Sequence, residues 1–560
     1  MTDTQRAPNK LMDYAFLPFT PRFIVFTLSI VAFVLLLAGI AHFPGATPLL
    51  SALAVLAGGL VLLGTLDLLQ TRHSILRNYP ISAHLRFLLE EVRPEMRQYF
   101  FEDDKHSMPF ARDKRAVVYQ RAKMVLDKRP FGTEYDVYAD GFEWLHHSIA
   151  PRPHAAAPFR VRIGGPDCTQ PYDASVFNIS AMSFGALSAN AIRALNAGAK
   201  QGGFAHDTGE GGISAYHRMA GGDIIWEIGS GYFGCRNVDG GFCPETFAAK
   251  ANDPQIKMIE VKLSQGAKPG HGGVLPGPKV TPEIAEIRGV ALGKDCISPA
   301  AHSAFSTPAG LLRFVADLRR LSGGKPTGFK LCIGQPHEFL AICKAMLATG
   351  LTPDFIVVDG KEGGTGAAPI EFMDHIGMPL RDGLSFVHDA LVGINLRDRI
   401  RIGASGKIVT AFDIARAMSL GADWCNSARG FMFALGCIQS QSCHTDRCPV
   451  GVATQDPTRQ RALVVPDKAT RVANFHRATM RSLIELTAAA GLDHPSGFTR
   501  TQLSRRVSPS EVQTFAELYV PLAPGELLTG TSHPRFARAW SEARADSFAS
   551  APATSVDMAA

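Results

Sequence analysis

The longest apolar stretch of the chain lies near its beginning. Residues 23–66 contain no Asp, Glu, Lys or Arg, and a Pro- and Gly-containing stretch at 43–48 favours a turn there. Each half, 23–42 and 49–66, is close to the ~20 residues that a transmembrane helix needs. A cleaved signal peptide would account for the first half but not for the second. The pattern predicts a two-helix transmembrane hairpin over 23–70, with a buried hairpin of a soluble protein as the alternative.

Basic residues flank this hairpin on both sides, and the loop between its halves has no charge. Because positive residues stay on the cytoplasmic side, the tail 1–22 and the main domain are predicted to be cytoplasmic. This predicts a multi-pass protein of the inner (cytoplasmic) membrane, with membrane lipid as a partner. The basic residues are Arg6, Lys10, Arg22, Arg72 and Arg77.

Residues 71–165 are rich in Arg, Glu and aromatic residues, and we interpret this stretch as a linker and cover without chemistry of its own. A second pattern starts near residue 170. Short apolar runs end in Gly, Ser, Asp or Lys, and most precede a helix-like segment, which predicts a parallel sheet. Eight such units predict an α/β fold, a (β/α)8 TIM barrel over 166–490. The eight runs are 176–182, 203–206, 258–263, 296–298, 328–331, 354–358, 399–402 and 423–426. The helical segments are 188–201, 308–321, 336–348, 411–420 and 469–490, and 491–560 is predicted to be a C-terminal tail.

Composition excludes two classes of protein. The net charge is +6, with no long Lys/Arg run, so nucleic-acid binding is not indicated. Ten cysteines in 560 residues are too few for a disulfide-stabilised scaffold.

Polar and glycine residues follow the predicted strands, where a barrel places its active site. Gly406 and Gly430 follow the seventh and eighth runs and would let backbone N–H groups approach a phosphate. Each loop alone is equally explained as a tight turn, but two adjacent glycine loops favour a phosphorylated ligand. Flavin mononucleotide (FMN) fits, with its phosphate there and Lys330 near its ring.

Three cysteines, Cys437, Cys443 and Cys448, have five and then four residues between them, and Pro449 follows the last. A Cys-Pro step that ends such a run is typical of iron–sulfur ligation. The arrangement fits a three-iron cluster, or a four-iron cluster with a fourth ligand elsewhere, for which Cys425 is the nearest candidate. Three buried, inert cysteines are the alternative. A thiolate cluster also indicates a reducing compartment.

Five stretches, taken together, resemble the FMN-binding synthase domain of glutamate synthases, specifically its shorter, stand-alone, membrane-anchored members. They are 180–188, 208–212, 262–270, 363–367 and 448–457, within a similarity that covers about 130–490. The resemblance implies FMN in a (β/α)8 barrel and a [3Fe-4S] cluster on Cys437, Cys443 and Cys448. It also implies that 2-oxoglutarate and ammonia form 2-iminoglutarate, which reduced FMN converts to glutamate.

By motif position, the resemblance assigns Glu210, Lys268 and Arg288 to the substrate pocket, where cations would offset two carboxylates. The alternative makes Lys268 and Arg288 surface residues. The expected cofactor-binding residues are Met182, Ser183, Gln265, Lys330, Asp359, Gly364, Thr365, Ser405, Gly406, Ala428, Arg429 and Gly430.

The chain departs from the family pattern in ways that affect function. Where glutamate synthases usually read Glu-Gly-Gly-Gln-Leu-Pro-Gly, residues 271–277 read His-Gly-Gly-Val-Leu-Pro-Gly, so Val274 replaces a substrate-binding Gln. Neither a glutaminase domain nor a G-x-G-x-x-G unit for NAD(P)H is expected, which predicts separate glutaminase and electron-donor proteins. Two alternatives stay open. One is a flavoenzyme that oxidises an amino or hydroxy acid and passes electrons to a membrane acceptor, and the other is a non-catalytic electron-transfer subunit.

Overall fold

The computed structural model describes residues 16–551, which form two compact units, one up to Ser107 and one from Met108 onward. We describe each unit by itself.

The first unit contains two long apolar helices, α2 (Ile24–His42) and α3 (Thr47–Leu69), joined by the short 3-10 helix η2 (Pro44–Ala46). Small residues of α3 face aromatic rings of α2: a Cβ atom added at Gly58 would lie 2.9 Å from the Phe33 ring. Such contacts let apolar helices approach closely. By length and composition both helices could cross a membrane, and most of their other side chains are exposed.

The hairpin continues into α4 (Ser74–Asn78), α5 (Ser82–Met96) and the π-helical turn η3 (Arg97–Phe101). Asp67, which is buried near the end of α3, fixes this continuation. Its carboxylate accepts hydrogen bonds from Ile81 N at 2.9 Å and His84 Nε2 at 2.9 Å.

The second unit is built on a closed barrel of eight parallel strands, which confirms the predicted fold. Hydrogen bonding joins the strands in their chain order, with β13 closing on β4. They are β4 (Phe177–Ile179), β5 (His206–Asp207), β6 (Ile224–Ile228), β7 (Ile256–Lys262), β10 (Thr327–Leu331), β11 (Phe355–Asp359), β12 (Arg401–Ser405) and β13 (Trp424–Ser427).

One predicted barrel strand was wrong. The run 296–298 forms β9 (Cys296–Ile297), which pairs antiparallel with β8 (Val274–Leu275) outside the barrel. Ile297 is 65% exposed, so the apolar side chain that suggested a barrel strand lies outside the core, although Cys296 beside it is buried. The missing strand is β6, whose five residues are all buried. The other seven predicted runs overlap barrel strands.

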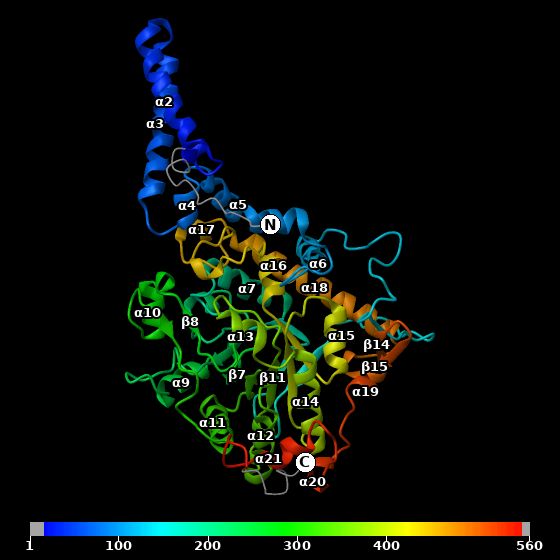
Figure 1. Cartoon of the computed structure of the whole chain (residues 1–560). Helices are drawn as coiled ribbons and strands as arrows, with labels where there is room; N and C mark the ends of the chain where they lie inside the picture. Colours follow the sequence, from blue (N-terminus) through cyan, green and yellow to red (C-terminus); the bar gives the residue numbers. More distant parts are fainter. Residues whose placement is uncertain (1–15, 552–560) are drawn as a thin grey trace, which may run out of the picture. The chain divides into compact units, whose positions relative to one another are not determined.

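Helices cover the outside of the barrel (Figure 1). They include α7 (Ala189–Gly202), α8 (Ala215–Arg218), α9 (Pro244–Ala251), α11 (Pro308–Leu321), α12 (Pro336–Thr349), α14 (Leu380–Gly393), α15 (Ala411–Ser419) and α16 (Arg429–Leu435). Two short helices, α10 (Pro282–Arg288) and α13 (Ile370–His375), belong to the connections that follow β7 and β11. In α7 the buried residues recur at helical spacing, and the Ser188 hydroxyl caps the first turn by accepting from Ala191 N.

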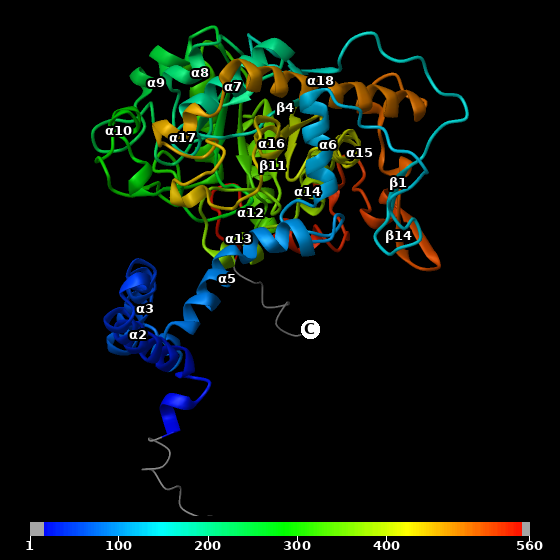
Figure 2. The same ribbon diagram turned by 90° about the horizontal axis from the view of Figure 1, so that it is seen from above.

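Segments on both sides of the barrel sequence complete this unit. The long helix α18 (Val465–Ala489) packs against α7 and α6 (Arg112–Lys123), as Figure 2 shows. Residues 491–560, predicted to be a tail, instead contain β14 (Leu503–Ser508) and β15 (Glu511–Thr514), and β14 pairs with β1 (Glu143–Leu145). The remaining helices are α17 (Pro457–Arg461), α19 (Phe515–Leu518), α20 (Glu526–Thr529) and α21 (Ala537–Glu542).

The N-terminal end of the barrel is closed. The hairpin of β2 (Arg160–Ile163) and β3 (Tyr172–Ser175) places Ile163 and Tyr172 in a buried cluster with interior side chains of the strands, among them Met258 and Trp424. Ligands are therefore expected at the opposite end, where the loops after the strands gather.

Candidate active site

Glycines bring the loops after β4 and β5 together. Gly209 has φ +64, and a Cβ atom added there would lie 2.7 Å from Ser183 N. Only glycine permits this approach. The consequence is that Glu210, expected in the substrate pocket, lies beside Met182 and Ser183, which are expected to bind the cofactor.

Glu210 is the only carboxylate that the sequence placed in the substrate pocket, and it is surrounded by cations. Lys262 Nζ lies 3.1 Å from Glu210 Oε2 and 2.5 Å from Gln265 Oε1. Burial opposes ionisation of Glu210, but the charges of Lys262, Arg288 and Lys268 outweigh it and lower the pKa of Glu210. The carboxylate is therefore held ionised.

Arg288, the last residue of α10, points inward. Its guanidinium donates to Phe184 O at 3.0 Å and lies 5.2 Å above the Phe233 ring. It is 4% exposed and Lys268 is 3% exposed, so the surface alternative for both residues is wrong.

Lys268 joins the loop after β7 to the loop after β11, since its Nζ donates to Ala367 O at 3.2 Å. Burial lowers the pKa of Lys268 to about 8, although Glu210 partly opposes this shift. The same two loops are fixed by Asp359, whose Oδ2 accepts from Gly266 N at 2.8 Å. Asp359 therefore has a clear structural role in addition to the predicted cofactor contact.

The segment that departs from the family pattern lies against Glu210. A Cβ atom added at Gly273 would be 2.0 Å from Glu210 Oε1, so only glycine fits there. The next residue, Val274, begins β8 and is half-buried. At this position, next to Gly273, the chain has methyl groups where the family pattern has an amide.

Lys330 lies inside the barrel in an ionic cluster that the sequence did not reveal. Its Nζ contacts the Glu227 carboxylate and lies 2.8 Å from Glu260 Oε1, with Asp207 nearby. Desolvation opposes the charge, but these carboxylates raise the pKa of Lys330 well above its usual value. Its ammonium is therefore neutralised from within the barrel. Glu227 lies on β6, the strand that the sequence pattern missed.

Two cations meet where the loops after β12 and β13 converge. Burial lowers the pKa of Lys407, and the neighbouring Arg429 lowers it further. Among residues 16–551 neither forms an ion pair with a carboxylate. Lys407 also adopts a left-handed backbone, φ +50, a strain that is typical of functional positions. Gly364 lies directly against Arg429, since an added Cβ would be 2.8 Å from Arg429 Nε. This arrangement suits an anionic group such as a phosphate.

Three of the four candidate cysteines share one environment. Burial raises the pKa of the Cys437 thiol to about 12, and Cys443 and Cys448 add to the rise, so the three lie within reach of one another's charge. Cys425, on β13, is completely buried, and its raised pKa is affected by Asp413 and Arg416 rather than by the other cysteines.

Comparison with known proteins agrees with this geometry. The family model described as "Conserved region in glutamate synthase" matches residues 169–493. The chain belongs to the glutamate synthase family. It is 39% identical over 477 residues to the glutamate synthase large subunit-like protein YerD of Bacillus subtilis, covering 78% of this chain and 90% of that protein. It is 37% identical over 315 residues to the archaeal glutamate synthase [NADPH] of Methanocaldococcus jannaschii, covering 56% of this chain and 59% of that enzyme.

The family match covers the residues of the candidate site. The barrel, the cysteine loop and every predicted site residue lie within the matched residues 169–493. The apolar hairpin and α6 lie before the match. Membership confirms the expected glutamate synthase-like oxidoreductase at the level of the family.

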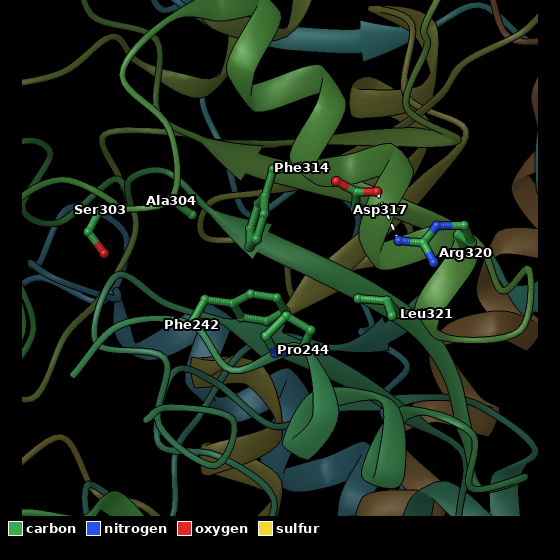
Figure 3. A pocket seen from close by; sticks show the side chains of 8 residues that line it. All are labelled: Phe242, Pro244, Ser303, Ala304, Phe314, Asp317, Arg320 and Leu321. Atoms are coloured by element: carbon green, nitrogen blue, oxygen red, sulfur yellow. Dashed lines mark hydrogen bonds and ion pairs between the residues drawn. The ribbon is translucent and has the colours of Figure 1, made fainter. Parts of the chain in front are cut away.

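A pocket of about 390 Å³ lies apart from these residues (Figure 3). It is formed by Phe242, Pro244 and Ser303–Ala304 together with α11 side chains that include an Asp317–Arg320 ion pair of 3.2 Å. Its lining contains none of the predicted site residues.

Sequence reasoning missed three residues of the site. Lys262 and Lys407 both stand at strand ends, a position that could have identified them, but neither was distinguished from other lysines of its motif. Glu227 lies on β6, and because the sequence pattern did not predict this strand, it could not place Glu227 in the barrel.

Proposed function

We propose that this protein reduces 2-iminoglutarate, formed from 2-oxoglutarate and ammonia, to glutamate. The supporting observation is the charge balance around Glu210. Lys262, Lys268 and Arg288 supply three positive charges against one carboxylate, which leaves an excess of two. That excess complements a dicarboxylate, and a buried charge partner typically contributes ~2–5 kcal/mol to binding.

Each residue has a distinct role in this proposal. Arg288 and Lys262 attract the substrate carboxylates, and Glu210 orients the two lysines by attraction. Lys268, with a pKa of about 8, is both charged and able to release a proton near neutral pH. Its Nζ therefore holds a proton that it can donate to the nitrogen of the bound substrate.

Lys407, after β12, and Arg429, after β13, fit the phosphate of FMN. Asp359 and Glu362 are near enough to affect Arg429, but neither cation forms an ion pair with a carboxylate in the described chain. Reduced FMN, when bound, supplies the hydride equivalent for the imine carbon. The chain residues that would hold it are Met182, Ser183, Gln265, Lys330, Asp359, Gly364, Thr365, Ser405, Gly406, Ala428, Arg429 and Gly430, to which we add Lys407.

Cys437, Cys443 and Cys448 fit a [3Fe-4S] cluster, because three thiols that affect one another's pKa lie on one loop. Such a cluster carries single electrons, and its binding requires that the thiols lose their protons.

The apolar helices α2 and α3 support a membrane-anchored protein with its barrel in the cytoplasm, in accord with the basic residues that flank them. Separate proteins would then supply electrons and ammonia.

Glutamate formation by the purified full-length protein tests this function. The assay contains 2-oxoglutarate, ammonium and photoreduced FMN, with a control that omits ammonium, and measures glutamate directly. Glutamate that depends on ammonium is expected. Its absence, together with flavin reduction by an added amino or hydroxy acid, would overturn the proposal in favour of the oxidising alternative.

A further inference from the structure

Helix α6 packs on the cysteine loop although it precedes the family match. The Tyr119 hydroxyl donates to Cys437 O at 2.6 Å. At the start of the helix, Gln439 Oε1 accepts from Phe110 N at 3.1 Å, and Gln439 Nε2 donates to Phe110 O at 3.2 Å. These contacts hold the segment of the loop that begins with Cys437.

Arg115 lies one helical turn before Tyr119, on the same face of α6. It is 6% exposed, and its Nε has no hydrogen-bond partner in the described structure. No carboxylate among residues 16–551 forms an ion pair with it. Because Tyr119 on this face hydrogen-bonds to Cys437 O, Arg115 is placed on the side of α6 that meets the cysteine loop. A buried guanidinium nitrogen without a partner is costly, which favours an anion beside Arg115.

Lys279 approaches the cysteine loop from the barrel side. It is 2% exposed, and its Nζ donates to Cys443 O at 3.2 Å and to Ala186 O at 3.0 Å. Ala186 belongs to the loop after β4, next to Met182 and Ser183, so Lys279 connects the cysteine loop to the predicted flavin site. Asp446 is near enough to affect Lys279, but the two form no ion pair.

We propose that Arg115 and Lys279 are positioning residues that provide the positive charge for an iron–sulfur cluster on Cys437, Cys443 and Cys448 and so set its reduction potential. The inference rests on the proposed cluster. A cluster with three thiolate ligands is anionic, and reduction adds one more negative charge. Buried cations stabilise the reduced form more than the oxidised form, which raises the potential.

The test compares full-length Arg115→Gln, Arg115→Lys, Lys279→Gln and Lys279→Arg with the wild type. Lys123→Gln, which removes an exposed cation from the same helix, is the matched control. For each protein we would measure iron and sulfide per chain, the low-temperature electron paramagnetic resonance spectrum, the flavin content and the cluster midpoint potential.

We expect each Gln variant to keep its flavin and to shift the midpoint to a more negative value by about 59 mV, a tenfold change for a one-electron couple. The charge-conserving variants Arg115→Lys and Lys279→Arg should have midpoint potentials near that of the wild type, as should Lys123→Gln. If a Gln variant loses iron, retention of iron by the charge-conserving variant at the same position supports the role of charge.

Two results would overturn the inference, and they differ in what they imply. Wild-type protein that contains flavin but no iron and sulfide removes the proposed cluster itself. A cluster that is present, with equal midpoints in the wild type and the Gln variants, refutes only the role of Arg115 and Lys279. Equal iron loss in Gln and charge-conserving variants likewise shows that shape, not charge, matters.

Discussion

Substitution of Lys262 by Met gives the most direct test of the charge arrangement at the barrel mouth. In the wild type, Lys262 Nζ lies 3.1 Å from Glu210 Oε2 and holds Gln265 as well. Met keeps most of the side-chain volume and removes the charge. The pKa of Glu210 should rise, because Lys262 is the strongest of the charges that lower it.

The size of the effect follows from burial. The two side chains are 11% and 18% exposed, so solvent screens the pair only weakly. Loss of one partner of a buried pair costs ~3–5 kcal/mol in stability, because the other charge is left unpaired. The pocket of Lys262→Met also has two cations instead of three for a bound dicarboxylate. Binding of 2-oxoglutarate should therefore weaken by ~2–5 kcal/mol, or about 30-fold to several thousand-fold.

Isothermal titration of 2-oxoglutarate into the purified protein at pH 7 measures this loss. The matched control is Lys257→Met, at the opposite end of β7, where Nζ lies 3.8 Å from Asp223 and both side chains are about one-third exposed. This control should bind as the wild type does. Wild-type affinity in Lys262→Met, or equal weakening in both variants, would refute the proposed role of Lys262.

Four further predictions follow from the same contacts. The wild-type affinity for 2-oxoglutarate should fall as the pH rises through about 8, because Lys268 then loses its charge, and Lys268→Arg should abolish this fall in a pH series of titrations. Val274→Gln should tighten binding by ~0.5–1.5 kcal/mol, and unchanged affinity would contradict the assigned position of Val274. Cys425→Ser should keep its iron, whereas Ser at Cys437, Cys443 or Cys448 should lose it; equal loss would reverse the assignment. Reporter fusions should place both termini in the cytoplasm, and an external C-terminus would exclude the proposed orientation.

The sequence predicted the barrel well because most strands are short apolar runs that end in polar or glycine residues. It failed at β6 because Gly221, Gly222 and Asp223 before it, and the glycines after it, resemble the long loop in which it was placed. It failed in the opposite direction at β9, where two apolar residues form a short strand that pairs antiparallel with β8 outside the barrel. Periodicity alone does not distinguish such short runs.

The site was predicted at the level of motifs rather than contacts. Glu210, Lys268 and Arg288 were identified from their motifs, and the structure brings them together. Their arrangement depends on glycines such as Gly209 and Gly273, whose need is visible only when the opposing loops are in place. Arg115 lies in a segment without any recognised motif, so only its packing against the cysteine loop reveals it.

Cations that form no ion pair with a carboxylate occur at all three proposed anion sites. Within the described part of the chain, none of the following six forms an ion pair: Lys268 and Arg288 at the substrate pocket, Lys407 and Arg429 at the phosphate site, and Arg115 and Lys279 at the cysteine loop. Elsewhere Arg319 and Arg500 are buried against Asp354 and Asp389. Lys325 is also unpaired, but it stands just before β10, away from the open end, and its Nζ donates to two carbonyl oxygens, each at 2.6 Å. Lys268, Arg288, Arg115 and Lys279 are buried, whereas Lys407 and Arg429 are half-buried. Since a buried charge without an ion pair destabilises the fold, the four buried cations are explained most simply by anionic ligands that neutralise them.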